Sequence, residues 1–195
     1  MKKILTISVA LLVFCNITLT AEVTDKFQPA IGGKIVNDLD AAVAKRRGGH
    51  YDEAIRGIQI IVSQVPNYYR AHYNLALAYA DSGNFVEASK YFSSALEIRE
   101  RERVTDLSIY NSMGWAKLLE GKPADAKKHF DIAEKNFDSL NGATKNKLMN
   151  NIGTMYLSVG EPEKAIDYFE RAEALGNTTA GKNAKISQSI MQINK

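Results

Sequence analysis

The sequence has a single cysteine and no concentration of charge of either sign. Cys15 lies inside an apolar N-terminal stretch, so a chain cleaved after that stretch would have no thiol and no disulfide. The formal net charge is +3, and the one basic run, residues 45–47, is short. A protein that binds nucleic acid needs a concentrated basic face to neutralise phosphates. The composition therefore argues against nucleic acid as the main partner.

Long hydrophobic runs are also missing, except near the N-terminus. Lys2 and Lys3 precede an apolar stretch over residues 4–19, and small residues follow up to Ala21. This order predicts a secretory signal peptide over residues 1–21 and a periplasmic or secreted protein. As a permanent membrane span the stretch is short, since about sixteen helical residues cover only about 24 Å. We therefore expect membrane contact only through the transient signal.

Cys15 leaves one alternative open, which is lipidation followed by membrane anchoring. The bacterial lipobox has a small residue directly before the cysteine, whereas this chain has the bulky Phe14. We therefore favour cleavage near Ala21. Loss of Lys2 and Lys3 would leave 23 basic against 22 acidic residues, a net charge of +1.

Residues that could carry catalysis or hold a metal do not form a recognisable set. His50, His72 and His129 have no ligand spacing and no accompanying cysteines or acidic cluster. Residues 176–183 come within one residue of a phosphate-binding loop, but Asn183 replaces the metal-binding hydroxyl and a helical pattern precedes the segment. The sequence therefore predicts no metal, no cofactor and no enzymatic activity.

One pattern recurs after residues 22–33, which we interpret as a linker because they contain Pro29, Gly32 and Gly33. Its fixed points are alanines at spacings of 34, 38 and 39 residues. A glycine stands five residues before each alanine, a bulky residue four after it, and another small residue upstream. The alanines are Ala54, Ala88, Ala126 and Ala165; the glycines Gly49, Gly83, Gly121 and Gly160; the bulky residues Ile58, Phe92, Phe130 and Phe169; and the upstream small residues Ala42, Ala76, Gly114 and Gly153.

This pattern resembles the tetratricopeptide repeat, in which each unit of about 34 residues is a pair of helices. Small residues let the two helices approach closely, the large aromatic fills the space between them, and the glycine supplies a left-handed turn. The resemblance implies an all-α fold, a right-handed superhelical stack of about four repeats closed by a capping helix. The predicted boundaries are 35–68, 69–102, 107–140 and 146–179 for the repeats and 180–195 for the cap.

Departures from the pattern add three expectations. Asp38 and Lys45 make the first helix polar, as suits a terminal repeat whose outer helix faces water. Extra residues between repeats two and three can lengthen a helix through Arg103, supported by a Glu97–Arg101 pair. An apolar stripe at the C-terminus predicts a helix that covers the open end of the stack through Ile186, Ile190 and Ile193.

In the tetratricopeptide family the first helix of each pair lines a concave groove. The resemblance assigns to this groove Arg70, Tyr73, Asn74, Leu77, Asn111, Trp115, Lys147, Asn150 and Asn151, together with Ser108, Ser112 and Thr154. An asparagine amide both donates and accepts, so it can pair with the backbone of an extended peptide whatever its sequence. Tyr73, Leu77 and Trp115 would form an apolar floor, although Trp115 could instead be wedged between helices.

These residues predict a non-enzymatic scaffold that binds a partner protein or peptide, and the resemblance suggests envelope, secretion or pilus assembly as its setting. Leu39 and Val43 stand where the chaperone-tail-binding members have lysine and asparagine, so that carboxylate clamp is not present in its usual form. The alternative is a structural assembly subunit that self-associates or docks rigidly without binding an extended peptide.

Overall fold

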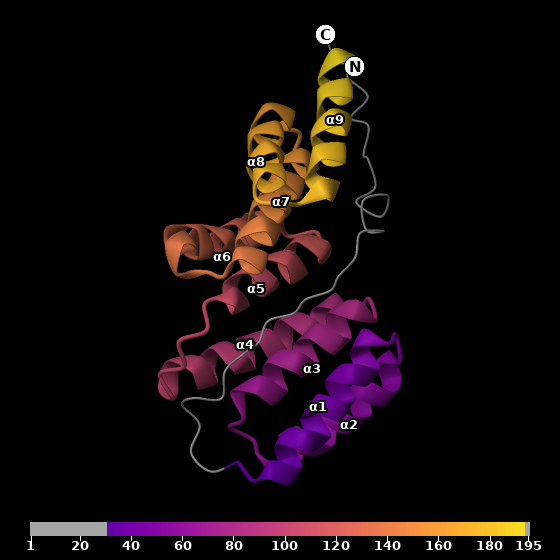
Figure 1. The fold of residues 1–195 in the computed structure, drawn as a ribbon, viewed down its shortest axis with the longest axis vertical. Helices are drawn as coiled ribbons and strands as arrows, with labels where there is room; N and C mark the ends of the chain where they lie inside the picture. The colour runs from indigo at the N-terminus through magenta and orange to yellow at the C-terminus, as the bar shows by residue number, and fades with distance from the viewer. Residues whose placement is uncertain (1–30, 194–195) are drawn as a thin grey trace.

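The computed structural model describes residues 31–193; the predicted signal peptide, Cys15 and most of the linker lie outside the described residues. Within this range the chain forms nine α-helices, one short 3-10 helix (Phe137–Ser139) and no strand. In Figure 1 the helices stack in chain order, with α1 and α2 at one end and α8 and α9 at the other. The helices are α1 (Gly33–Arg47), α2 (Tyr51–Gln64), α3 (Tyr69–Asp81), α4 (Phe85–Arg101), α5 (Ser108–Leu119), α6 (Pro123–Lys135), α7 (Gly142–Ser158), α8 (Pro162–Ala174) and α9 (Thr178–Ile193).

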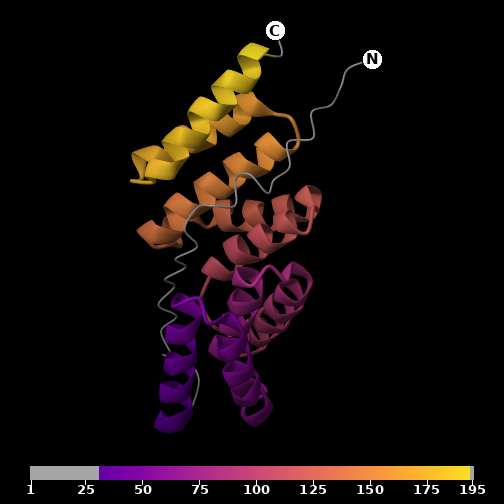
Figure 2. The same ribbon diagram turned by 90° about the vertical axis from the view of Figure 1, so that its right-hand side faces the viewer.

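The first eight helices form four pairs, α1/α2, α3/α4, α5/α6 and α7/α8, and α9 follows the last of them. Figure 2 shows the pairs layered along the long axis. The predicted all-α stack of repeats is therefore confirmed. The extra residues before repeat four lengthen α7, which begins at Gly142, four residues ahead of the predicted boundary.

Local sequence explains where several helices begin. Asn84 and Asn141 precede α4 and α7, and their side chains accept hydrogen bonds from the backbone N–H of Glu87 (3.3 Å) and Thr144 (2.8 Å). These caps satisfy N–H groups that have no partner within the helix. The helices α6 and α8 begin at prolines, which fit the first turn because they lack the N–H that would go unbonded there.

The predicted glycine turns occur after the first helix of every pair. Gly49, Gly83, Gly121 and Gly160 all have φ between +76° and +83°. After α3, for example, the N–H of Asn84 donates to the carbonyl of Tyr79 over 2.8 Å, the bond that closes such a helix end. A side chain at these φ values is strained, which is why glycine recurs there.

The close approach inside each pair is clearest at Phe130. A Cβ atom added at Gly114 would lie 2.6 Å from the Phe130 ring, and one at Gly153 would lie 2.7 Å from Phe169. Both phenylalanines are at most 1% exposed. The predicted pairing of a small slot with a large aromatic is therefore confirmed.

The helix before repeat three ends earlier than predicted. The α4 helix stops at Arg101, because Arg103 adopts φ +54° and the N–H of Val104 turns back to the carbonyl of Arg99 over 2.9 Å. Among the described residues, Arg101 bonds Glu102 (3.0 Å) and Asn67 (2.8 Å) instead of the predicted Glu97. The predicted Glu97–Arg101 pair was wrong.

The C-terminal helix covers the stack with a face that differs in part from the predicted one, since Ile190 is half-buried but the most buried residues are small. Ala180, Ala184 and Ser187, spaced by four and three residues, are buried, whereas Ile186 is 45% exposed. Small side chains allow α9 to lie close to α8, and this contact turns Ile186 outward. The prediction for Ile186 was therefore wrong, and the side chain of Ile193 lies outside the described residues.

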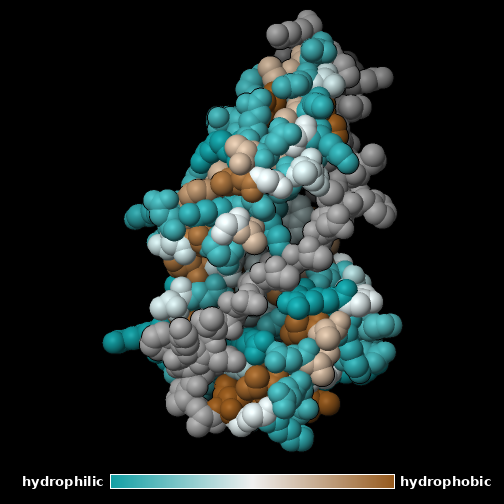
Figure 3. All heavy atoms as spheres, in the orientation of Figure 1, coloured by the Kyte–Doolittle hydropathy of each residue, from teal (hydrophilic) through white to brown (hydrophobic). Residues whose placement is uncertain are grey.

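One face of the molecule carries its apolar residues in separate groups (Figure 3). On the face shown in Figure 3, apolar groups lie between hydrophilic ones over the part of the chain that the structure describes. None of the helices within residues 31–193 is both long enough and apolar enough to cross a bilayer.

Candidate partner-binding surface

The first helices α1, α3, α5 and α7 line up side by side and form what we call the inner face. The predicted site residues lie on three of these helices, and they divide by exposure. Tyr73, Asn74, Leu77 and Asn111 are buried, so a partner cannot reach them in this conformation. The half-buried members are Arg70, Trp115, Lys147, Asn150 and Asn151.

Polar side chains on the inner face bond to one another from helix to helix. The Tyr73 hydroxyl on α3 lies 3.0 Å from the Ser112 hydroxyl on α5, and 3.4 Å from that of Ser108. The Asn151 amide on α7 donates to the Asn111 side-chain oxygen on α5 over 3.0 Å. These contacts connect repeats two, three and four.

The same pattern reaches the C-terminal helix, where the Asn183 amide donates to the side-chain oxygen of Asn150 over 3.1 Å. We call the set the inner ladder: Tyr73, Ser108, Ser112, Asn111, Asn151, Asn150 and Asn183. Sequence reasoning placed most of these residues on one face but missed Asn183, and it assigned the asparagines to a partner instead of to each other. The two roles are compatible for Asn150 and Asn151, because the ladder uses only one of the two hydrogen-bonding groups of each amide.

Asn74 is occupied differently. Its amide donates to the backbone carbonyl of Arg70, one turn earlier, over 2.8 Å. The Arg70 guanidinium extends to Asp40 on α1 over 2.5 Å. Asn74 thus serves its own helix, and Arg70 connects the first helices of repeats one and two.

Burial governs the ionisation of Tyr73. Burial, with the negative charge of Asp106 nearby, raises the pKa of Tyr73 to about 12. The phenol therefore stays protonated at physiological pH and keeps its hydrogen-bonding proton for the serines of α5.

A buried ion pair that the sequence did not predict joins α1 to α3. Arg46 Nη1 lies 2.6 Å from Asp81 Oδ2, and both side chains are at most 7% exposed. Burial raises the pKa of Asp81, against the opposing effect of Arg46 and, more weakly, Lys147. Both residues occupy the last turns of their helices, outside the four groove positions that the resemblance supplied.

Lys147 on α7 lies within electrostatic range of this pair. Burial lowers the pKa of Lys147, the charge of Arg46 lowers it further, and Asp81 acts in the opposite direction. A residue of repeat four therefore senses charges of repeats one and two.

For Trp115 the sequence left two positions open, in the groove or wedged between helices. It is half-buried and packs against the apolar cluster built from α5 to α9. It remains partly exposed on α5, one of the helices of the inner face. Aromatic side chains with one packed and one open side are common anchors at protein interfaces.

The remaining sequence candidates have structural roles. His72 is 8% exposed and its Nε2 lies 2.8 Å from the Pro66 carbonyl, so it packs inside the stack. The segment resembling a phosphate-binding loop runs into α9, which begins at Thr178. Within residues 31–193 no three His, Cys, Asp or Glu side chains lie close enough to hold a metal ion together.

Consecutive helix pairs that pack through small residues, with left-handed glycines between their helices, define a helical repeat protein. Two family models, each described as Tetratricopeptide repeat, match residues 68–139 and 148–180, which together are more than half of the chain. The chain belongs to the tetratricopeptide repeat family.

Solved structures with this fold include a MamA protein, at 22% identity and a TM-score of 0.63, covering 82% of this chain and 83% of MamA. The pilF protein of Pseudomonas aeruginosa is 18% identical with a TM-score of 0.66, covering 82% and 71%. The Cut9–Hcn1 hetero-tetramer of the APC/C is 16% identical with a TM-score of 0.69, covering 81% of this chain but 30% of its own. No curated protein sequence matches this chain. At these identities the likeness shows the fold alone.

Proposed function

We propose that this chain is an exported, non-enzymatic scaffold that binds a partner polypeptide on its inner face. The tetratricopeptide fold is generally a protein–protein interaction scaffold and its family is typically non-enzymatic. The single observation that carries the proposal is the grouping of half-buried polar and aromatic side chains on the inner face. That group is Arg70, Trp115, Lys147, Asn150 and Asn151.

The partner would be held by its backbone and one side chain. Asn150 and Asn151 each use one hydrogen-bonding group in the inner ladder and keep the other for a peptide N–H or carbonyl. The open side of Trp115 supplies apolar contact, and Arg70 and Lys147 supply positive charge at the two sides. Envelope, secretion or pilus assembly is part of this proposal, and the hetero-tetramer among the similar structures supports assembly with other chains.

Binding is tested with peptides selected from a random library against the full chain. Lys147→Glu should weaken the selected peptides by about tenfold or more, because charge reversal at a half-buried contact costs several kcal/mol. Lys135→Glu makes the same charge change at an exposed position on α6 and is the matched control. Equal affinities of both variants and the parent would remove the inner face as the binding surface.

Export is tested separately by the intact mass of the protein from its native host. Loss of about the first 21 residues would support the signal peptide. A shorter cut with added acyl mass would instead indicate an anchor at Cys15, and a full-length mass would contradict export.

A second candidate function is a structural subunit that docks rigidly. The observation that favours it is the exposed Ile186 on the terminal helix α9. This alternative predicts self-association, so that the size of the protein in solution grows with its concentration. Ile186→Glu should abolish this growth, and the inner face should retain no selected peptide.

A further inference from the structure

The terminal helix α9 packs in the register of the first helix of a repeat. Three buried residues of α9 are spaced by four and three residues, and three buried residues of α7 have the same spacing. The two sets are Ala180, Ala184 and Ser187 on α9, and Leu148, Ile152 and Met155 on α7. Because the spacing of buried residues fixes which side of a helix faces the core, α9 and α7 present equivalent sides to the repeat before them.

Two equivalent hydrogen bonds of the inner ladder support this register. The Asn183 amide on α9 donates to the side-chain oxygen of Asn150 on the preceding first helix over 3.1 Å. The Asn151 amide, at the equivalent position of α7, donates to the side-chain oxygen of Asn111 on its own preceding first helix over 3.0 Å. The inner face therefore continues over α9 and does not end at α7.

The register assigns two further residues, Lys182 and Ile186, to the inner face. Lys182 directly precedes Asn183, at the position that Asn150 occupies in α7, and it is exposed. Ile186 follows Asn183 by three residues, at the position that Trp115 occupies in α5, and it is 45% exposed. Residues three or four apart lie on one side of a helix, so Lys182 and Ile186 share a side. The exposed isoleucine of α9 thus belongs to the inner face.

In the second half of the stack, charge is sorted between the inner and the outer helices. The outer helices α6 and α8 carry seven acidic and five basic residues. The inner helices α5, α7 and α9 carry no acidic residue, and their basic residues are Lys117, Lys145, Lys147, Lys182 and Lys185. This half of the inner face is therefore positively charged, although the chain as a whole is nearly neutral.

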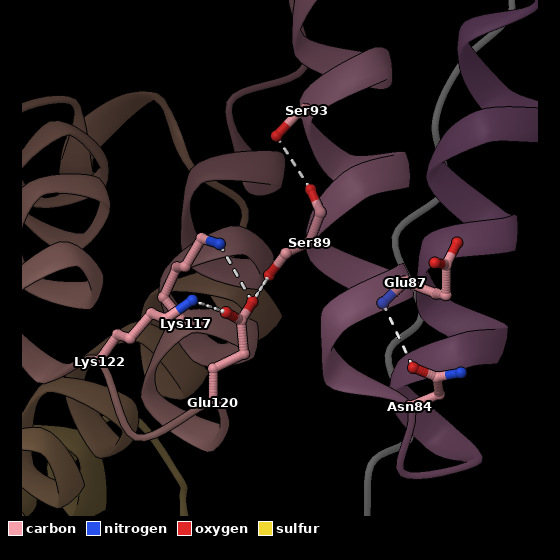
Figure 4. Close-up of polar contacts among 7 residues, drawn as sticks. All are labelled: Asn84, Glu87, Ser89, Ser93, Lys117, Glu120 and Lys122. Atoms are coloured by element: carbon pink, nitrogen blue, oxygen red, sulfur yellow. Dashed lines mark hydrogen bonds and ion pairs between the residues drawn. The ribbon is translucent and has the colours of Figure 1, made fainter.

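The charge of one of these lysines, Lys117, is balanced within the stack. Its ammonium group lies 3.0 Å from one carboxylate oxygen of Glu120, and Lys122 lies 2.7 Å from the other. Ser89 on α4 donates to the same carboxylate (Figure 4). The Glu120 side chain is only 4% exposed, so Lys117 serves to compensate a buried charge. The positive charge of the inner face therefore comes from α7 and α9.

In the first half of the stack, the acidic residues of the inner helices are neutralised by neighbouring basic residues. The helices α1 and α3 contain three acidic residues, and each of them forms an ion pair. The pairs are Lys34–Asp38 at 3.3 Å, Arg70–Asp40 at 2.5 Å and Arg46–Asp81 at 2.6 Å. A negatively charged partner would therefore meet little repulsion along the described first helices.

We propose that the binding surface extends over α9 and that its partner is an extended segment in which acidic and large apolar side chains alternate. This inference rests on the proposed binding of a polypeptide by the inner face. The basic residues Arg70, Lys147 and Lys182 precede the positions of the apolar Trp115 and Ile186 by four to seven residues, or about 6–10 Å along a helix. Successive side chains of an extended chain point to opposite sides, so one side of the partner meets the basic row and the other the apolar row.

The chemistry of the partner is tested by the fluorescence anisotropy of three short labelled peptides mixed with the full chain. In the first peptide glutamate alternates with leucine, in the second lysine replaces the glutamate, and in the third serine replaces the leucine. The first should bind about tenfold more tightly than either of the others, since each of those lacks the contacts to one row. Equal or tighter binding of the lysine peptide, or no binding of the first peptide, would overturn the proposal.

The extension over α9 is tested with two variants and two matched controls. Lys182→Glu and Ile186→Ser should each weaken binding of the first peptide by about three- to tenfold, because each contact is partly exposed to water. Lys135→Glu and Ile132→Ser make the same changes at exposed positions of α6 and should leave the affinity unchanged. Circular dichroism checks that all four variants keep the helix content of the parent.

The outcomes separate this inference from the proposed function on which it rests. If Lys147→Glu weakens binding but Lys182→Glu and Ile186→Ser do not, the inner face binds peptides but ends at α7, and only the extension is wrong. If none of the three variants changes the affinity, both proposals are wrong. Binding to vesicles of anionic phospholipid that Lys182→Glu abolishes, or self-association that Ile186→Ser abolishes, without peptide binding, would assign α9 to another partner and overturn the inference.

Discussion

The space inside a helix pair and the space between neighbouring first helices are built by different chemistry. Inside the pair α5/α6, Phe130 meets Gly114 with no room for another carbon. Between α5 and α7, Asn111 and Asn151 meet through one hydrogen bond. The apolar contact has one good arrangement, whereas the amides can exchange partners. We therefore expect the pair cores to contribute most of the stability. The hydrogen bonds of the inner face should be the contacts that rearrange when a partner binds.

The largest effect should come from emptying a pair core. Phe130→Ala should lower the free energy of unfolding by about 3–5 kcal/mol, because it leaves a cavity where the two helices meet. Chemical denaturation measures the change. Ile132→Ala on the same helix, at a 40% exposed position, is the control and should stay within about 0.5 kcal/mol. Similar losses in both variants would contradict the assignment of stability to the pair core.

A smaller loss should follow from overfilling the same core. Gly114→Ala should cost about 1–3 kcal/mol, since the new methyl group would lie 2.6 Å from the Phe130 ring unless the helices separate. Gly142→Ala is the matched control, because nothing lies within 4 Å of a Cβ atom there. The thermal midpoint of each variant gives the answer, and a Gly114→Ala protein as stable as the parent would show that the pair can spread at little cost.

Substitutions in the inner ladder should reveal an interaction energy between Asn111 and Asn151 rather than a large loss of stability. Asn111→Ala should cost about 0.5–1.5 kcal/mol, because the half-buried Asn151 amide loses its partner but can still bond water. The Asn111→Ala, Asn151→Ala double variant should cost less than the sum of the two single ones. A double-mutant cycle measures the difference, and strict additivity would mean that the bond contributes nothing.

The smallest effect should be a loss of thermal stability at mildly acidic pH. Burial lowers the pKa of both His72 and His129, although the Pro66 carbonyl opposes this at His72. At pH values between the folded and the unfolded pKa of these histidines, the unfolded chain binds more protons than the folded one. The contribution of the neutral histidines to the free energy of unfolding is therefore fully present above about pH 6.5 and declines as the pH falls below that value. Thermal midpoints between about pH 7.5 and 5 should show the decline. His129→Gln should reduce it, and an identical slope in that variant would assign the effect elsewhere.

On the inner face, the positions of several residues could be predicted from the sequence, but their hydrogen-bond partners could not. The resemblance placed Asn111, Asn150 and Asn151 on the same side of successive helices, as the structure shows. Their partners could not be predicted, because Asn111 and Asn151 are 40 residues apart and the rotation of each helix about its axis decides whether they meet. The buried pair of Arg46 and Asp81 was missed for the same reason.

The sequence alone determined the repeat and the pair core. Gly83, Gly114 and Phe130 act through neighbours within one repeat, so a local pattern is sufficient to specify their roles. Only the tertiary structure decided which face of α9 packs, that Ile186 turns outward, and that Lys147 approaches the charges of α1 and α3. Those outcomes depend on small rotations between neighbouring repeats, which accumulate along the stack. A local sequence pattern does not predict the accumulated rotation.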